Sequence, residues 1–233
     1  MRKVHQEEFG KLWDLNEVWN SLTPDEKVFI DQHTEIKRYR KNEVIHSEGD
    51  QTTHIVMVVQ GMVRLTKEGV GQRLQIIRLL KPYDTFGYRS AIAGDTHSTC
   101  ATTLEPTVTY RIDREAFLSV IQKNIDFCYK VLVAMSKDLG ISETQTVNLT
   151  QKHIRGRLAE TLINLKKTYG FEGDGVTIAM YMAREDLANM SNMTTSNAIR
   201  TLSQFASEGL ISLDGRKIKL LDELELTRIS RMG

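Results

Sequence analysis

The sequence predicts an α+β protein in which a β-barrel or jelly roll is followed by one long helix and then by a winged helix-turn-helix. Short segments rich in Val, Ile, Thr and Tyr, separated by glycines, fill residues 36–112. Apolar residues recur every three or four positions over residues 114–148. Two short helical patterns and two alternating strand patterns follow near the C-terminus. We therefore expect a barrel domain at residues 1–113, a long helix at 114–148 and a C-terminal domain at 149–233.

Composition limits the kinds of function that the chain can have. The 233 residues are 40% hydrophobic and 26% charged, which suits one large or two modest globular domains. With a formal net charge of +1, any attraction to nucleic acid must come from a local cluster of cations. Cys100 and Cys128 form no CxxC pair and no cluster with histidine, so the sequence predicts neither a metal site nor a disulfide framework. An apolar leader and an apolar run of about 18 residues are both missing, so we expect a cytoplasmic protein without a membrane partner.

Helices are expected before the barrel, and antiparallel strands within it. Residues 9–33 have helical character, and Thr23-Pro24 marks the start of a second short helix, because Thr caps a helix and Pro fits its first turn. His54–Gly61 and Met62–Glu68 are expected to be neighbouring strands, with Gln72–Leu80 as a further strand. Closure into a barrel or jelly roll leaves few free strand edges.

The long helix is expected to be the interface of a homodimer. Its apolar stripe is too long to be covered by one subunit, so a second copy of the helix is the expected cover. The alternative is a helix packed wholly against its own barrel. The residues that we assign to the dimer contact are Phe117, Ile121, Ile125, Cys128, Leu132, Met135 and Leu139.

A helix-turn-helix is predicted over residues 182–205, an arrangement that can place one helix in a DNA groove. Asn192 is expected in the turn, since Asn tolerates a positive φ, and Thr194 is expected to cap the second helix. Ala198, Leu202 and Phe205 recur at spacings of four and three and predict its buried side. An ordinary helical hairpin with a solvated polar face would show the same pattern.

Two further short strands predict a wing beside that second helix. Leu210–Leu213 and Arg216–Leu220 alternate in polarity, and Asp214-Gly215 between them is a strong hairpin signal. Cations on such a wing can neutralise phosphates beside the groove. The predicted DNA-binding residues are Thr194, Thr195, Ser196, Asn197, Arg200 and Ser203 on the second helix, and Arg216, Lys217 and Lys219 on the wing.

Several stretches together resemble one known family. They are Ser47-Glu-Gly-Asp50, Phe86-Gly87, Ile154-Arg-Gly-Arg-Leu-Ala-Glu-Thr-Leu-Ile-Asn-Leu165, Arg184-Glu-Asp-Leu-Ala188, Asn197-Ala-Ile-Arg-Thr-Leu202 and Glu208-Gly-Leu-Ile211. In this order the chain resembles the cyclic-AMP receptor protein and fumarate-nitrate reductase regulator (Crp/Fnr) family of bacterial transcription factors. The resemblance implies a barrel of the cyclic-nucleotide-binding type, a homodimer on two-fold double-stranded DNA, and RNA polymerase as a partner. By the same resemblance Arg200 is the candidate for a bidentate contact to guanine.

The resemblance also implies where an effector would bind, and the chain departs from the family there. Cyclic-AMP readers of the family have a glutamate after the glycine of the turn, and an arginine and a serine about ten residues later against the phosphate. This chain has Gly87-Tyr88-Arg89 and then His97-Ser98-Thr99. We therefore expect that the barrel does not bind cyclic AMP through the contacts usual in the family. If a small-molecule effector exists, its candidate residues are Gly87, Tyr88, Arg89, Ser98 and Thr99.

The alternatives to a regulator with a small-molecule effector are a regulator that holds an iron-sulfur cluster or haem, a regulator without an effector, and a metalloenzyme. The run Gly87–Ile92 is closer to the oxygen-sensing branch of the family, but residues 1–30 contain no cysteine, so we expect no iron-sulfur cluster. His33, His46, His54 and His97 leave haem open, although a lone histidine on a strand is more often only hydrogen-bonded. A regulator without an effector is a further alternative. A cupin-type metalloenzyme would need a His-x-His pair, and none occurs, so we expect no enzyme activity.

Overall fold

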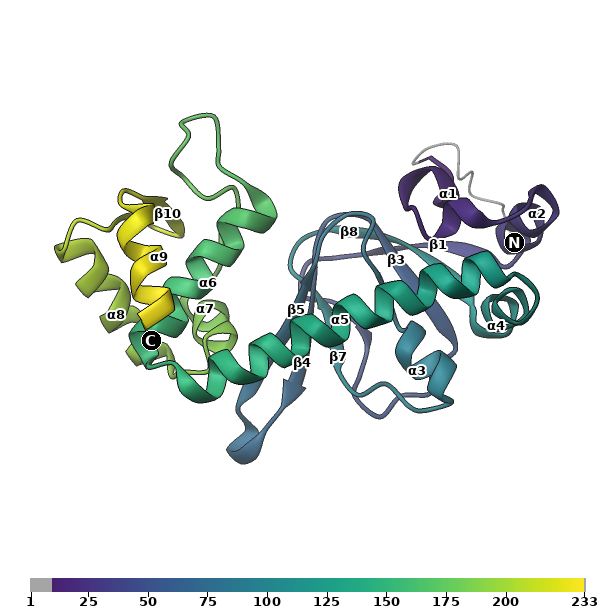
Figure 1. Cartoon of the computed structure of the whole chain (residues 1–233), viewed down its shortest axis with the longest axis horizontal. Coiled ribbons are helices and arrows are strands. Elements are labelled where there is room, and N and C mark those ends of the chain that lie inside the picture. Colours follow the sequence, from purple (N-terminus) through teal and green to yellow (C-terminus); the bar gives the residue numbers. More distant parts are fainter. Residues whose placement is uncertain (1–9, 233) are drawn as a thin grey trace. The chain divides into compact units, whose positions relative to one another are not determined.

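The computed structural model describes residues 10–232, and these form two compact units. The first unit consists of residues 10–72 and 76–140, and the second of residues 73–75 and 141–232. A long helix, α5, contains the passage from residue 140 to residue 141 (Figure 1).

Short helices precede the sheets of the first unit. They are α1 (Leu12–Leu15), the 3-10 helix η2 (Trp19–Ser21) and α2 (Pro24–Gln32). Thr23 caps α2 as predicted: its hydroxyl accepts from the Glu26 backbone, and the Glu26 carboxylate accepts from the Thr23 backbone. Phe9, where the predicted helical stretch begins, lies outside the described residues.

The predicted jelly roll is present as two four-stranded sheets, with orders β1-β8-β3-β6 and β2-β7-β4-β5. Every strand pair for which a register is defined is antiparallel. The strands are β1 (Thr34–Tyr39), β2 (Val44–His46), β3 (His54–Gln60), β4 (Val63–Glu68), β5 (Leu74–Leu80), β6 (Thr85–Phe86), β7 (Cys100–Thr103) and β8 (Thr107–Asp113); the 3-10 helix η3 (Val70–Gln72) joins β4 to β5.

The expected pairing of β3 with β4 is wrong, because these two strands lie in different sheets. β3 pairs with β8 and β6, whereas β4 pairs with β7. The chain changes sheet at Gly61, where φ is +86° and a Cβ would lie 2.5 Å from the Pro106 carbonyl oxygen. No side chain fits so close to another backbone, so glycine is required at this crossing.

β3 lies at the centre of the first unit and is buried on both faces. Val56 and Val58 face an inner core that also contains residues of β4, β5 and β7, namely Val63, Leu80 and Ala101. Ile55 and Met57 face the other way, into a core shared with the short helices and with α4 and α5. Burial on both faces explains why His54–Gln60 is a continuous apolar run without polar alternation.

The helix expected over residues 114–148 is two helices, α4 (Arg114–Lys123) and α5 (Ile125–Gln151). Asn124 separates them with an extended backbone, and its side-chain oxygen accepts from the Phe127 backbone to start α5. Its amide nitrogen donates to Glu26 at 2.6 Å and to the Ser21 carbonyl at 3.2 Å, which ties the break to the N-terminal helices. Gly140 lies inside α5.

A further short helix, α3 (Tyr88–Ala93), was not expected from the sequence. Gly87 precedes it at φ +87°, where an added Cβ would lie 3.1 Å from the His54 carbonyl oxygen. This close approach of backbone to backbone explains a glycine before Tyr88 without reference to a ligand.

The second unit is a small helical domain with a β-hairpin. Its helices are α6 (Ile154–Tyr169), α7 (Arg184–Met190), α8 (Thr195–Ser207) and α9 (Glu223–Met232), and its strands are β9 (Ile211–Asp214) and β10 (Lys217–Leu220). The segment before α7 adds to the hairpin, because Ile178 donates to the Ile218 carbonyl and Leu220 donates to the Val176 carbonyl. Helix α9 packs against α6.

Candidate DNA-binding site

The turn between α7 and α8 has the predicted geometry. Asn192 has a φ of +49°, so the chain reverses at a non-glycine residue. Thr194 caps α8, since its hydroxyl accepts from the Asn197 backbone at 3.2 Å. The Met193 backbone donates to the Ala188 carbonyl at 3.0 Å and closes the turn. These contacts confirm the helix-turn-helix.

Helix α8 has one buried side and one exposed polar side. Ala198, Leu202 and Phe205 are at most 1% exposed, as their spacing predicts. On the other side, Arg200 and its polar neighbours are exposed to solvent, while Asn197 is half-buried. The exposed members of the predicted set are Thr194, Thr195, Ser196, Arg200 and Ser203. This side can therefore meet a partner without unfolding of the core.

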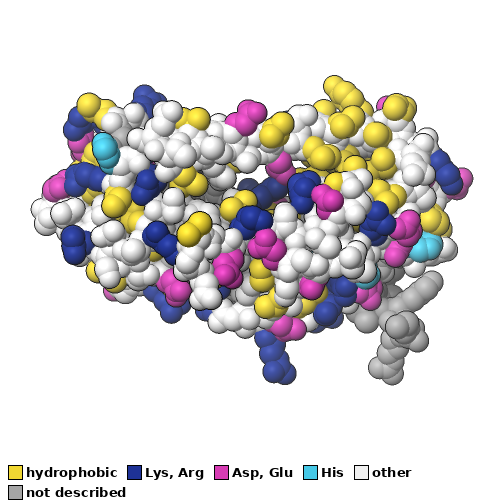
Figure 2. Space-filling model, turned by 90° about the horizontal axis from the view of Figure 1, so that it is seen from below, with side chains coloured by type: hydrophobic (Ala, Val, Ile, Leu, Met, Phe, Trp, Pro, Cys, Tyr) yellow, Lys and Arg dark blue, Asp and Glu magenta, His cyan; other side chains and the backbone are white. Residues whose placement is uncertain are grey.

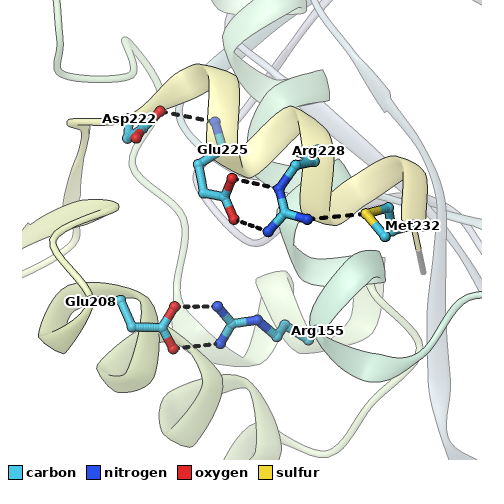
Figure 3. Close-up of polar contacts among 6 residues, drawn as sticks. All are labelled: Arg155, Glu208, Asp222, Glu225, Arg228 and Met232. Carbon is cyan, nitrogen blue, oxygen red and sulfur yellow. Dashed lines mark hydrogen bonds and ion pairs between the residues drawn. The ribbon is translucent and has the colours of Figure 1, made fainter.

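Two arginines near the start of α6 hold the ends of this motif, and the sequence reasoning did not assign them a role. Arg155 forms a bidentate ion pair with Glu208, the residue that ends α8 (Figure 3). Its guanidinium also lies 4.8 Å from the ring centre of Phe205. Arg157 donates to the carbonyls of Ser191 and Asn192 in the turn, at 2.9 and 3.1 Å. The helix dipole disfavours cations at the start of a helix, so two arginines there could have indicated partners outside α6.

Helix α9 is ordered by contacts within its own length. Asp222 accepts from the Glu225 backbone at 2.9 Å and so caps the helix (Figure 3). Glu225 accepts twice from Arg228, whose third contact is to the Met232 sulfur at 3.1 Å. These residues stabilise the helix that covers α6, and they give no sign of a ligand site.

The predicted wing is present, with its turn one residue later than the Asp-Gly signal suggested. Asp214 pairs with Lys217, so the two turn residues are Gly215, with φ +56°, and Arg216. Arg184 donates to the Gly215 carbonyl at 2.7 Å and so links the wing tip to α7. Arg216 is exposed at that tip.

The two wing lysines contact acidic residues of their own chain. Lys217 lies 3.4 Å from the Glu172 carboxylate and also over the ring of Tyr181, at 5.2 Å from its centre. Lys219 lies 3.9 Å from Asp174. Hydrogen bonds from the Thr177 side chain and backbone lower the pKa of Asp174 to about 2, so it is ionised at neutral pH. Acidic residues of the loop before α7 thus accompany both wing lysines.

Among the effector candidates, Tyr88 is engaged within the first unit. Its phenol donates to Asp138 of α5, and Arg78 of β5 donates to the same carboxylate oxygen at 2.6 Å. Burial, and then the bond to Asp138, raise the pKa of Tyr88 to about 12. Arg78 and Tyr88 thus surround a carboxylate that the chain itself supplies.

The other effector candidates lie in separate settings. Arg89 is exposed and 3.8 Å from Asp95. Ser98 and Thr99 are half-buried just before β7, and the Ser98 carbonyl accepts from Lys67 at 3.1 Å. The structure does place His97 beside Gly87, with the His97 Cε1 atom 3.7 Å from where a Gly87 Cβ would be. His97 thus lies next to the Gly87 turn, where cyclic-AMP readers of the family that this chain resembles have an arginine.

His97 and His46 form a stacked pair near Gly87, with ring centres 3.6 Å apart and planes 7° from parallel. Burial, and then the neighbouring His97, lower the pKa of His46 to about 4. Burial also lowers the pKa of His97. Over residues 10–232, no group of three or more His, Cys, Asp or Glu side chains is arranged to hold a metal ion.

The predicted dimer residues divide into exposed and buried ones. Ile125, Leu132 and Leu139 on α5 are exposed by 79%, 55% and 61%. Phe117 is buried between Trp19 and Phe127, with ring centres 5.9 Å from both. Its assignment to a subunit contact is therefore corrected: it stabilises the core of its own unit.

The remaining predicted dimer residues are only partly accessible. Ile121 and Met135 pack partly against the same core as Phe117, and Cys128 is half-buried. Tyr129, which was not predicted, is 66% exposed on the same helix as Ile125. Hydrophobic side chains gather on part of the molecular surface in Figure 2 rather than being evenly spread.

Comparison with known proteins agrees with this architecture. Residues 36–124 match the cyclic nucleotide-binding domain, and residues 156–229 match the Crp-like helix-turn-helix domain. The chain belongs to the Crp/Fnr family of transcriptional regulators. It is a transcription factor rather than an enzyme, and it binds DNA through its Crp-type helix-turn-helix.

Relatives of this Crp/Fnr chain are distant but span most of its length. It is 22% identical to the CRP-like cAMP-activated global transcriptional regulator of Mycobacterium tuberculosis, covering 83% of this chain and 87% of that protein. It is 24% identical to the fumarate and nitrate reduction regulatory protein of Vibrio cholerae, over 90% of this chain and 84% of that one. The structure of FixK2 from Bradyrhizobium japonicum aligns with a TM-score of 0.76 at 25% identity, covering 84% of this chain and 96% of that one.

Crp/Fnr proteins are typically dimeric. In the described part of this member, none of the helices is both long enough and apolar enough to cross a membrane.

Proposed function

We propose that this Crp/Fnr protein is a homodimer that reads a two-fold DNA site with the exposed side of α8. We further propose that it responds to an effector, and that this effector is not cyclic AMP held by the contacts usual in the family. The observation that carries the reading of DNA is the polar exposed side of α8, with Arg200 among short side chains. Arg200 lies one helical turn after Ser196, so its guanidinium can enter the major groove while the neighbours allow close approach.

The dimer is supported by exposed apolar residues on α5. Ile125, Leu132 and Leu139 are each more than half exposed. Exposed apolar residues repeated along a helix suit a paired helix better than solvent. A two-fold protein dimer then presents two copies of α8 to two DNA half-sites. RNA polymerase remains the expected partner in transcription.

The effector proposal rests on the residues around Gly87. The relative from Mycobacterium tuberculosis is described as cAMP-activated. In this chain Tyr88 stands where family readers of cyclic AMP carry a glutamate, and its phenol already donates to Asp138. His97 in turn replaces the arginine that would bind the phosphate, and burial lowers its pKa, so it is a poor source of positive charge at neutral pH.

Arg200→Ala tests the proposed reading of DNA. We expect a loss of about 1–3 kcal/mol per contact on the preferred site, with relaxed preference at one symmetric base pair. Affinity would be measured on the selected duplex and on a scrambled duplex at several salt concentrations. Arg216→Ala at the wing tip is the control: it should weaken both duplexes similarly and reduce the salt slope by about one unit. If Arg200→Ala weakened both duplexes equally and kept the base preference, Arg200 would not be the reader.

A further inference from the structure

One side chain in the second unit joins the end of α5 to the helix-turn-helix. The guanidinium of Arg157 donates to the carbonyls of Ser191 and Asn192, at 2.9 and 3.1 Å, and to those of Leu149 and Lys152, at 3.2 and 3.1 Å. The first pair follows α7, in the turn before α8. The second pair belongs to the last turn of α5 and the residue after it.

All four acceptors lie at or just past the end of a helix, and only Leu149 belongs to the helix itself. The last carbonyls of a helix have no partner within the helix, and they carry the negative end of its dipole. A guanidinium has five donors in a rigid plane, so it can serve the ends of two helices at once. An ammonium group is more compact and cannot reach four separated carbonyls together. Arginine is therefore suited to join these two segments, and lysine is not.

Other contacts hold each side of Arg157 separately. Glu160, three residues along α6, accepts from Asn148 at 2.9 Å and from Lys152 at 3.0 Å, so it also holds the end of α5. Thr161 shares a buried hydrogen bond of 2.8 Å with Ser191, so it holds the turn. Because of these contacts, loss of Arg157 should leave the helix-turn-helix folded on α6 and remove a direct link between the turn and α5.

We propose that Arg157 is a positioning residue that fixes the direction of α8 relative to the end of α5, and that it thereby sets the spacing of the two DNA half-sites. This proposal rests on the proposed two-fold dimer through α5. In such a dimer the half-sites lie about 34–36 Å apart, or a multiple of that, and the separation of the two α8 helices must match it. A residue that fixes α8 to the dimer helix then selects spacing, whereas a residue that holds α8 only within its own domain affects each half-site equally.

Arg155 supplies a matched control from the same turn of α6. It holds Glu208 and Phe205, which both belong to the end of α8, and these two contacts do not involve α5. Arg155→Gln and Arg157→Gln remove the same charge two residues apart. Arg157→Lys keeps the charge and removes the planar set of donors, so it separates the geometry from electrostatic attraction to DNA.

The first measurement is the DNA affinity of the full chain. One set of duplexes carries two copies of its selected half-site, and the segment between the copies is lengthened or shortened by one or two base pairs. A further duplex carries one half-site. We expect the wild type to prefer its best spacing by about tenfold or more over a one-base-pair change. In Arg157→Gln and Arg157→Lys this ratio should fall below about threefold, with single half-site affinity within about twofold of wild type. Arg155→Gln should lower single half-site affinity and keep the spacing ratio.

The second measurement needs no DNA. Amide hydrogen exchange should become faster at residues 149–153 and 191–193 together in both Arg157 variants, and in Arg155→Gln it should become faster only near the end of α8. If the wild type bound none of the duplexes but the variants still showed this exchange pattern, the proposed function would be refuted. The link between α5 and the turn would still be supported by the exchange rates. If Arg157→Lys preserved both the exchange rates and the spacing ratio, or if Arg157→Gln lowered all affinities by one common factor, Arg157 would be an ordinary structural residue and the proposal would be overturned.

Discussion

The stacked imidazoles of His46 and His97 are a costly arrangement at acid pH. His46 Nε2 is buried and has no hydrogen-bond partner among the described residues. A proton added to His46 would lie in an apolar setting beside a second imidazole, and the Asp50 carboxylate opposes this only in part. Arg89 further disfavours a charge on His97. Both rings are therefore neutral at neutral pH.

This pair predicts a loss of stability in acid. The pKa of His46 is about 4 in the folded chain, whereas an unperturbed histidine, as in the unfolded chain, has a pKa of 6.5. The unfolded chain takes up this proton at a higher pH than the folded chain does. The contribution of neutral His46 to the free energy of unfolding is therefore fully present above pH 6.5, and about 3 kcal/mol is lost as the pH falls toward 4. His46→Phe should keep the ring stack and lose this part of the pH dependence, measured as urea unfolding at pH 7 and pH 5. His33→Phe, at an exposed ring, is the control, and equal pH dependence in His46→Phe and wild type would contradict the assignment.

Among the elements, the wing carries less available positive charge than its sequence suggests. Lys217 and Lys219 each have a carboxylate within 4 Å, from Glu172 and Asp174. DNA phosphates would have to compete with these acids for both lysines. Exposed ion pairs of this kind contribute little to folding, so their removal should affect binding more than stability.

Glu172→Gln should therefore strengthen DNA binding. Release of Lys217 adds about one phosphate contact, so affinity for every duplex should rise about two- to fivefold at low salt, and the salt slope should become steeper by about 0.9. Binding would be measured by fluorescence anisotropy between low and moderate salt. Glu115→Gln, an exposed carboxylate of the first unit, makes the same change in net charge and should have no such effect. Unchanged affinity in Glu172→Gln would mean that Lys217 does not contact DNA.

The elements show which local signals were sufficient and which were not. Asn192, Thr194 and the buried stripe on α8 obey rules of a few neighbouring residues, so the helix-turn-helix could be predicted. The pairing of β3 depends on partners far along the chain, and an apolar run does not encode them. The break at Asn124 was missed for the same reason, because it depends on Ser21 and Glu26. Likewise, no pattern near Tyr88 indicates that Asp138 will occupy its hydroxyl.

On the scale of the whole molecule, the proposed dimer depends on apolar residues that one chain leaves exposed. Leu132→Glu together with Leu139→Glu should dissociate it, because each subunit would then bring two carboxylates into a helix pair. The solution mass by sedimentation equilibrium should fall by half, and affinity for a duplex with two half-sites should approach that for one.

Leu221→Glu together with Leu224→Glu is the control for this prediction. These leucines are also exposed, by 55% and 86%, but Leu221 lies just before α9 and Leu224 in its first turn, away from α5 in the sequence. The control should keep the solution mass of the wild type, because α5 is unchanged. A dimer that survived the α5 double variant would have its interface elsewhere.

Gly140 has a consequence for the mechanics of α5. A glycine inside a helix costs roughly 1 kcal/mol relative to alanine, and a Cβ at this position would meet no atom within 4 Å. Crowding therefore does not require a glycine here. The residue lies where the helix passes from one compact unit to the other, so the most compliant peptide of α5 coincides with the border. The parts of α5 on either side, residues 125–139 and 141–151, contain no other glycine, so the weakness in helix propensity is confined to one position of the 27.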